Sequence, residues 1–392
     1  MTGEGAICVD ALPDDWKEAT IAEHFDFKNG LNKAKQFFGY GTPIVNYMDV
    51  YRQPWLLPSH VTGKVSVTRG EQQAYSVKQY DAFFTRTSET VAEIGMCSVL
   101  MGPIESAVFS GFVLRARPSS DRLLPGFVAF AFRSRKVRQQ IESSATYTTR
   151  ALTNGRLLSA VSFALPPVHE QQHITAALKD IDDLIASVDV LIAKKRDIKQ
   201  AAMQQLLTGK LRLPGFTGVW ETVELGSLCS MKSGTGITSR SIFEDGPFPV
   251  YGANGLRGFT GSKTHNGVFP LIGRVGALCG NIQIARGDFF ASEHAIVAEP
   301  RARTDPEWLA LALTRLGLNR LSEASAQPVL TVGKLGVLRL LAPTDHLEQR
   351  AISRAILSMD DELKQLRSKM GKLRDIREGM TQQLLTGRIR LV

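Results

Sequence analysis

The sequence predicts a mixed α/β (α+β) protein: two domains joined and separated by two long antiparallel helices that form a coiled coil, in a pseudo-twofold circular arrangement. The main observation is the hexapeptide Gln-Gln-Leu-Leu-Thr-Gly, which occurs at Gln204–Gly209 and again at Gln382–Gly387. An apolar seam precedes each copy, and the two remaining segments open with similar residues. The predicted boundaries are residues 1–167 for the first domain, 168–210 for the first helix, 211–345 for the second domain and 346–392 for the second helix.

Both domains open with related residues and have similar composition. Leu12–Gly30 resembles Pro214–Gly234, with Trp16 matching Trp220 and a Lys two residues before each final glycine. Further on, short β-branched and aromatic runs alternate with Gly and Asn turns, a pattern typical of short strands. Short helical stretches follow the strands, so we expect both domains to be mixed α/β.

The segments between and after the domains have the spacing of long helices. Apolar residues step by four and three, as in a heptad seam, and the glycine after each "QQLLT" is typical of a helix C-terminus. Each segment predicts one helix of roughly 37 residues, about 55 Å long. That length exceeds a small domain, which favours pairing of the two helices over burial in separate cores. The expected coiled-coil residues are Ile174, Leu178, Ile181, Ile185, Val188, Ile192, Ile352, Ile356, Met359, Leu363, Leu366 and Met370.

Composition and charge narrow the classes of function. The net charge is +9 and the isoelectric point is near 9.4, which favours a polyanionic partner. No apolar run approaches the roughly 18–20 residues needed to span a membrane. The N-terminal residues lack the features of a secretory signal. The four cysteines are far apart with no Cys-x-x-Cys pair, so we expect a cytoplasmic protein with reduced thiols and no metal site.

Several motifs together resemble a known family. Pro166-Pro167 and Glu170-Gln171 stand at the start of the first predicted helix, and "LLTGKLRL" stands at its end. The second domain contains "FPVYGANGLRG", "LIGRVGALCGN" and "ASEHAIV". In type, order and repetition these motifs resemble the specificity subunit of type I restriction–modification systems. The resemblance covers nearly the whole chain and is weakest in residues 31–160.

The resemblance implies a DNA-reading scaffold. Each domain would be a target recognition domain that reads half of a bipartite, gapped target in double-stranded DNA, mainly in the major groove. The helices would set the gap and dock two modification (methyltransferase) subunits, and restriction (translocase/endonuclease) subunits would join them. We expect no cofactor in this chain; S-adenosylmethionine, ATP and Mg would belong to the partner subunits. The chain itself would have no catalytic activity.

Polar and basic residues at the turns that the two domains share are the candidate DNA contacts. A basic run in the first domain, "RSRKVR", is a candidate for phosphate contact, and a solvated helix face is its alternative. The candidate residues are Lys28, Asn29, Asn46, Tyr47, Arg133, Arg135, Lys232, Ser233, Tyr251, Asn254, Arg274 and Asn281.

Motifs of catalysis are incomplete. The only Pro-Pro lies in "ALPPV", without the Asn or Asp and the aromatic residue of an adenine methyltransferase motif. Gly258–Thr264 fails the phosphate-loop spacing, and Glu293 beside His294 lacks the spacing of a zinc protease. Two alternatives stay open: a coiled-coil adaptor without specific DNA binding, and an enzyme with an unrecognised active site.

Overall fold

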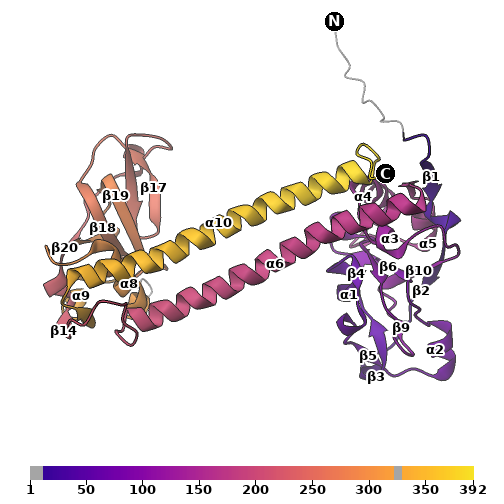
Figure 1. The fold of residues 1–392 in the computed structure, drawn as a ribbon, viewed down its shortest axis with the longest axis horizontal. Helices are drawn as coiled ribbons and strands as arrows, with labels where there is room; N and C mark the ends of the chain where they lie inside the picture. Colours follow the sequence, from indigo (N-terminus) through magenta and orange to yellow (C-terminus); the bar gives the residue numbers. More distant parts are fainter. Residues whose placement is uncertain (1–11, 322–328) are drawn as a thin grey trace, which may run out of the picture. The chain divides into compact units, whose positions relative to one another are not determined.

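The computed structural model describes residues 12–321 and 329–392. It confirms the prediction of two mixed α/β domains joined by two long helices (Figure 1). The chain divides into two compact units, Met1–Ser187 with Met370–Val392, and Val188–Lys369. We call the globular part of the first unit domain 1 (residues 12–167) and that of the second domain 2 (residues 211–345). Cys8 lies outside the described residues.

Domain 1 consists of short strands and short helices. The strands are β1 (Lys17–Thr20), β2 (Phe25–Asn29), β3 (Phe38–Val45), β4 (Trp55–Leu56), β5 (Lys64–Val65), β6 (Ala82–Thr85), β7 (Thr87–Ser88), β8 (Cys97–Leu100), β9 (Val108–Phe109), β10 (Val113–Pro118), β11 (Thr146–Tyr147), β12 (Ala151–Leu152) and β13 (Ser162–Leu165). The helices are α1 (Tyr47–Tyr51), α2 (Arg69–Ala74), α3 (Pro125–Ala131), α4 (Arg135–Ser144) and α5 (Gly155–Ser159). The largest sheet has the strand order β2-β10-β6-β8-β4, and β3 lies between β5 and β9 in another.

An aromatic cluster forms the centre of domain 1. The ring of Phe132 packs edge-on against Phe25 at 5.5 Å and against Phe163 at 5.2 Å between centroids. Phe84 lies 5.8 Å from the same ring. Helix α3 begins with Pro125, whose fixed φ suits the first helical position, and its following residues are all buried. These rings and α3 therefore belong to one of the buried core clusters of domain 1.

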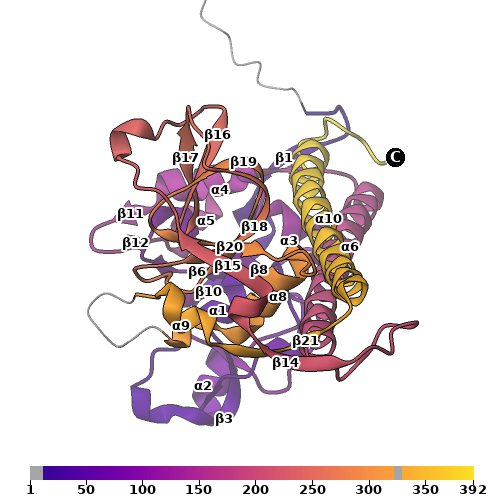
Figure 2. The same ribbon diagram turned by 90° about the vertical axis from the view of Figure 1, so that its left-hand side faces the viewer.

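Domain 2 has fewer and longer strands, seen with their labels in Figure 2. The strands are β14 (Trp220–Glu224), β15 (Cys229–Ser233), β16 (Phe248–Gly252), β17 (Gly255–Thr260), β18 (His265–Gly273), β19 (Ile282–Ala291), β20 (Ala295–Pro300) and β21 (Arg339–Pro343). The helices are α7 (Leu225–Leu228), α8 (Pro306–Leu316) and α9 (Val332–Gly336). The main sheet has the order β15-β20-β18-β19-β16-β17, and β14 pairs with β21.

Helix α8 forms where its local sequence specifies a helix. The Asp305 side chain accepts a hydrogen bond of 2.8 Å from the Trp308 N–H, and Pro306 occupies the first helical position. The helix ends at Gly317 in the left-handed conformation (φ 62°). Trp308 and Leu309 are fully buried, so α8 supplies the centre of the domain 2 core.

Helices α6 (Val168–Leu206) and α10 (His346–Leu384) are each 39 residues long and unbroken. In the first unit, Ile174 and Leu178 of α6 join Leu384 of α10 in the core of domain 1. In the second unit, Leu206 and Ile352 belong to the core of domain 2. Every residue of the expected seam is buried or half-buried.

Ion pairs show the direction of helix pairing within each unit. In the first unit the Arg377 Nε lies 2.8 Å from Asp182 Oδ1. In the second, Lys195 pairs with Glu362 and Lys199 with Asp360. Residue numbers rise along α6 as they fall along α10, so the helices pair antiparallel. These exposed pairs contribute about 0–1 kcal/mol each, and the apolar seam supplies most of the stability.

The same buried cluster closes each unit, and we call it the clasp. In the first unit, Arg390 donates two hydrogen bonds of 2.7 and 2.8 Å to the fully buried carboxylate of Glu170, which also accepts one from Trp16 Nε1 at 2.8 Å. In the second, Arg212 donates two of 2.6 and 2.8 Å to Glu348, and Trp220 one of 3.3 Å. The clasp ties the turn after one helix to the start of the other, and Figure 1 shows the end of α10 and the start of α6 near β1 in the first unit.

No helix within residues 12–321 and 329–392 is both long enough and apolar enough to cross a membrane. The same residues contain no group of three or more His, Cys, Asp and Glu side chains that could bind a metal ion.

Candidate functional site

Both domains contain the same crossing of strands and loops. In domain 1, β3 runs parallel to β9 and pairs Val45 with Phe109. In domain 2, β16 runs parallel to β19 and pairs Tyr251 with Ala291. After this pairing the chain makes a three-residue connection to the next strand, residues 110–112 before β10 and residues 292–294 before β20. We call these two connections the tip loops.

The first residue of each tip loop is a serine with the same main-chain partners. The Ser110 N–H donates to the Val45 carbonyl at 3.0 Å, and the Ser292 N–H donates to the Tyr251 carbonyl at 2.8 Å. Each serine carbonyl then accepts from the residue three positions on, at 3.0 and 2.9 Å. The two serines are therefore structural equivalents, although their surroundings differ in sequence.

The third residue of each tip loop is also held alike. The Phe112 carbonyl accepts from the Arg86 N–H, and the His294 carbonyl accepts from the Arg274 N–H, each at 2.9 Å. Arg86 directly follows β6, which pairs with β10, and Arg274 directly follows β18, which pairs with β20. In each domain the partner strand is the one that starts after the tip loop. Phe112 is thus the equivalent of His294, and Arg86 of Arg274.

Glycine is required at Gly30 and Gly234, which follow β2 and β15 and lie against the tip loops. A Cβ on Gly30 would lie 2.0 Å from the Ser110 carbonyl oxygen, and one on Gly234 would lie 2.3 Å from that of Ser292. Such distances are far inside van der Waals contact, so only glycine fits. The sequence match between Gly30 and Gly234 therefore marks the same contact in both domains.

Three candidate DNA contacts of domain 2 lie on strands that end beside the tip loop. Lys232 and Ser233 are the last residues of β15 and are exposed. Tyr251, at the end of β16, is half-buried, with its ring edge-on to Phe289 at 5.8 Å. Lys232 and Ser233 are thus free to meet a ligand, whereas Tyr251 offers only part of its ring.

The remaining candidates of domain 2 lie on neighbouring turns. Asn254 is exposed between β16 and β17, and Arg274 and Asn281 are half-buried in the connection between β18 and β19. A Cβ on Gly273 would lie 2.7 Å from the Ala253 carbonyl oxygen, so the two turns are in contact. The structure therefore brings these candidates together beside the tip loop.

In domain 1 the candidates differ in accessibility. Lys28 and Asn29 end β2 and are exposed, and the Lys28 ammonium lies 5.7 Å from the centre of the Tyr75 ring. The side-chain amide of Asn46 is half-buried and donates to the Ile44 carbonyl at 3.2 Å. Lys28 and Asn29 match Lys232 and Ser233, while Asn46 has a local structural partner.

Tyr47 lines a cavity of about 350 Å³ on domain 1. Its ring stacks on Tyr51 at 5.8 Å and 15°. Exposed Met48 and Phe112 line the same cavity, together with Arg150. The cavity is therefore aromatic and apolar on one side and has a cation beside it.

A carboxylate also lines this cavity. Glu93 accepts hydrogen bonds from the Tyr51 hydroxyl at 2.8 Å and the Ser88 hydroxyl at 3.1 Å. These hydrogen bonds lower the pKa of Glu93, which keeps it ionised. The hydrogen bond to Glu93 raises the pKa of the Tyr51 phenol. The cavity thus contains an ionised carboxylate as well as the cation of Arg150.

The two arginines of the basic run have different positions. The Arg133 guanidinium donates to main-chain carbonyls of Val50, Tyr51 and Gln53 at 2.8–3.0 Å and to that of Cys97. Burial lowers the pKa of Arg133 to about 10. This arrangement speaks against a phosphate contact by Arg133, because its donors already bind four carbonyls in two segments of the domain, residues 50–53 and Cys97. Arg135 begins α4 and is exposed.

Sequence reasoning missed Arg86. A signal was present, since "AFFTR" and "PLIGR" both end a buried strand with arginine. The equivalence becomes visible only when the main-chain partners of Arg86 and Arg274 are compared. Neither guanidinium forms an ion pair with another described residue.

Comparison with known proteins agrees with the pattern of two domains and two helices. Residues 218–369 match the family described as "Type I restriction modification DNA specificity domain". The EcoprrI type I restriction enzyme specificity subunit of Escherichia coli is 40% identical over 143 residues, which are 36% of this chain and 35% of that relative. The match thus spans about a third of the relative's length.

Two solved structures have the same fold over nearly the whole chain. One is the type I restriction–modification S subunit of M. genitalium, with a TM-score of 0.62, 18% identity and coverage of 96% of this chain and 97% of that one. Another comes from a study of complex assembly and conformational transition of the type I R-M system, with a TM-score of 0.61, 18% identity and coverage of 97% and 100%. Residues 218–369 thus match a type I DNA specificity domain, and the chain as a whole shares its fold with specificity subunits of type I restriction–modification systems.

Proposed function

We propose that the chain is the DNA sequence-recognition subunit of a type I restriction–modification complex. It binds a bipartite, gapped target in double-stranded DNA, and each domain reads one half. The observation that carries this proposal is the tip-loop crossing, which recurs in both domains with different side chains at equivalent places. A repeated frame with different exposed groups suits two half-sites of different sequence.

Basic side chains around each tip loop would position the DNA. Arg86 in domain 1 and Arg274 in domain 2 follow equivalent strands, and Lys28 and Lys232 end equivalent strands. Arginine and lysine bind phosphate oxygens and so fix the register of a protein on the duplex, while base edges supply sequence specificity. The net charge of +9 is consistent with this role.

We further propose that α6 and α10 act as a spacer between the half-sites and as the docking surface for two modification subunits, which restriction subunits join. Support comes from the family and from the 39 unbroken residues of each helix. Specificity subunits are non-catalytic as a family, and we assign this chain no reaction of its own. S-adenosylmethionine, ATP and Mg would belong to the partner subunits.

A map of methylated adenines across the genome of the source cell, with and without this gene, tests the proposal. Loss of one motif made of two short half-sites with a fixed gap is the expected result. A coiled-coil adaptor without specific DNA binding is the alternative, and a titration of the purified chain separates the two. DNA recognition predicts that log affinity falls linearly with log salt, by about 0.9 per phosphate contact. No methylation change and no salt-dependent binding would overturn the proposal.

A further inference from the structure

We infer that the third residue of each tip loop, Phe112 in domain 1 and His294 in domain 2, is a specificity-determining side chain, and that Phe112 reads the methyl group of a thymine. This inference rests on the proposed function, because it names the base contacts of a DNA-reading chain. It adds two residues that are absent from the candidate contacts drawn from the sequence.

The geometry of the two positions is the first support. Both carbonyls accept from an arginine N–H at 2.9 Å, so the Cα atoms of Phe112 and His294 are held alike while their side chains are free to differ. Phe112 is 58% exposed as a residue, and the His294 side chain is 44% exposed. A fixed main chain with an exposed, variable side chain is what sequence-specific contact requires.

The surroundings of Phe112 favour an apolar group over a charged one. Phe112 and Met48 are exposed apolar side chains that line the same cavity of about 350 Å³ as Tyr47. Clustered exposed apolar residues mark interaction surfaces. Glu93 and Arg150 line the same cavity with opposite charges, so the cavity has no surplus of positive charge for a phosphate, and the exposed apolar side chains suit an apolar part of a base. In the major groove that group is the thymine methyl.

The surroundings of His294 favour a hydrogen bond instead. Its Nε2 lies 3.4 Å from a carboxylate oxygen of Glu293, and the other oxygen of Glu293 accepts from the Ile237 N–H at 3.2 Å. With Nε2 facing Glu293, Nδ1 is the ring nitrogen that remains for a base edge. Domain 1 has Gly111 in place of Glu293. A carboxylate that can hold the ring of the third tip-loop residue is therefore present only in domain 2, where that residue is a histidine.

The test uses the full chain and a duplex that contains the target found by methylation mapping. Each thymine of the half-site is replaced in turn by deoxyuridine, which removes only the methyl group. The wild-type chain should lose about fourfold in affinity at one position, the effect of burying one methyl group. Phe112→Ala should bind the thymine duplex more weakly and show no further loss with deoxyuridine at that position.

His294→Ala provides the matching measurement for the other half-site. It should lower the preference for one base pair by on the order of tenfold and leave the deoxyuridine response of the domain 1 half-site unchanged. Tyr40→Ala and Phe243→Ala are controls, because both side chains are 57% exposed aromatics outside the tip loops. Neither should change base preference.

The outcomes distinguish failure of the proposed function from failure of the base contacts. A wild-type chain without a target, or without salt-dependent DNA binding, would overturn the proposed function. A wild-type chain that binds its target with no loss at any deoxyuridine position would overturn the methyl contact alone. The same holds if Phe112→Ala keeps the full deoxyuridine effect. An unchanged base preference in His294→Ala would remove His294 from the reading set.

Discussion

Domain 1 and domain 2 are attached to their helices by the same contact, yet the surface around that contact differs between them. In the first unit the Gln171 side chain accepts from the Leu124 N–H at 2.9 Å, and in the second Gln349 accepts from the Asp305 N–H at 2.9 Å. Both glutamines also donate to a main-chain carbonyl just before the helix, at 3.0 Å. One buried amide thus fixes each helix start to the domain beside it.

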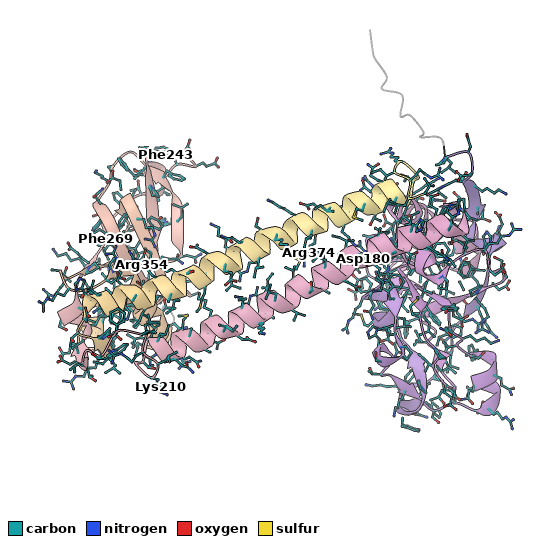
Figure 3. The ribbon with its side chains drawn as sticks, in the orientation of Figure 1. Asp180, Lys210, Phe243, Phe269, Arg354 and Arg374 are labelled. Atoms are coloured by element: carbon teal, nitrogen blue, oxygen red, sulfur yellow. The ribbon has the colours of Figure 1, made fainter. Side chains whose placement is uncertain are left out.

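The cavities near this contact differ in the balance of apolar and charged side chains, and the one in the first unit also has Lys179, Asp182 and Asp183 in its lining. In the first unit a cavity of about 820 Å³ is lined by Trp55, Met101 and Leu124 beside α6. In the second a cavity of about 500 Å³ is lined by Glu307 and two arginines of α10, including Arg354, labelled in Figure 3. A few buried polar contacts therefore suffice to repeat the frame, and the neighbouring side chains are free to diverge.

Breaking the helix that both units share should have the largest effect. Ile185→Pro removes a main-chain hydrogen bond within α6 and costs about 3 kcal/mol or more locally. Methylation of the target should be lost while both domains stay folded, as measured by methylation mapping and circular dichroism. Val190→Ala, at a side chain that is 70% exposed on the same helix, is the control. Target choice that survives Ile185→Pro would contradict the spacer role.

The two clasps should be close in strength. Glu170→Gln and Glu348→Gln each leave an arginine without its buried charge partner, which costs about 3–5 kcal/mol. Hydrogen exchange of each domain during denaturant titration would measure the effect and assign it to one unit. Glu18→Gln, which breaks an exposed pair with Lys136, should cost at most about 1 kcal/mol. A large loss for only one of the two clasp variants would show that the clasps are not equivalent.

Removing the equivalent arginines should weaken DNA binding by similar amounts. Arg86→Ala and Arg274→Ala should each lower the slope of log affinity against log salt by about 0.9, since each removes one phosphate contact. Titration of the full chain with its target at several salt concentrations gives this slope. Arg354→Ala, at an exposed position on α10, should leave it unchanged. If Arg274 changes the slope and Arg86 does not, the two domains hold DNA differently.

Acid sensitivity should be the smallest effect and should be present in both domains. Burial lowers the pKa of His24 in domain 1 and of His265 in domain 2. Because the unfolded chain then binds the proton more readily, stability falls as pH drops below about 6.5 and levels off below the folded pKa. Between pH 7.5 and 5, the free energy of unfolding of domain 1 should depend less on pH in His24→Gln than in the wild type. The pH dependence of domain 2 should be unaltered. An unchanged domain 1 profile would exclude His24 as a source.

The repeat and the long helices were predictable because their signals are local. A glycine follows each "QQLLT" at Gly209 and Gly387, and both have positive φ, 68° and 73°. The heptad spacing of Ile174, Leu178 and their partners requires only the period of an α-helix. The match of Gly30 with Gly234 was also visible as a repeated residue, although the contacts that require glycine there, with Ser110 and Ser292, were not.

The partners of most site residues were not predictable, because they lie far apart in the sequence. Arg133 belongs to a basic run, and only the folded chain shows that it binds carbonyls of residues 50–53 and 97. Phe112 belongs to no motif, and its equivalence to His294 depends on arginines that precede them by about twenty residues or more.

By itself, then, the sequence determined the two long helices and the alternation of domain and helix along the chain, since helical periodicity, glycine turns and repeated sequence motifs are properties of neighbouring residues. The tertiary structure alone decided which side chains meet at the tip loops and which arginines are buried. Those outcomes depend on strand pairings such as Val45 with Phe109 and Tyr251 with Ala291, which join segments 40 residues or more apart. No local pattern encodes such a pairing, because its free energy comes from the packing of the whole domain.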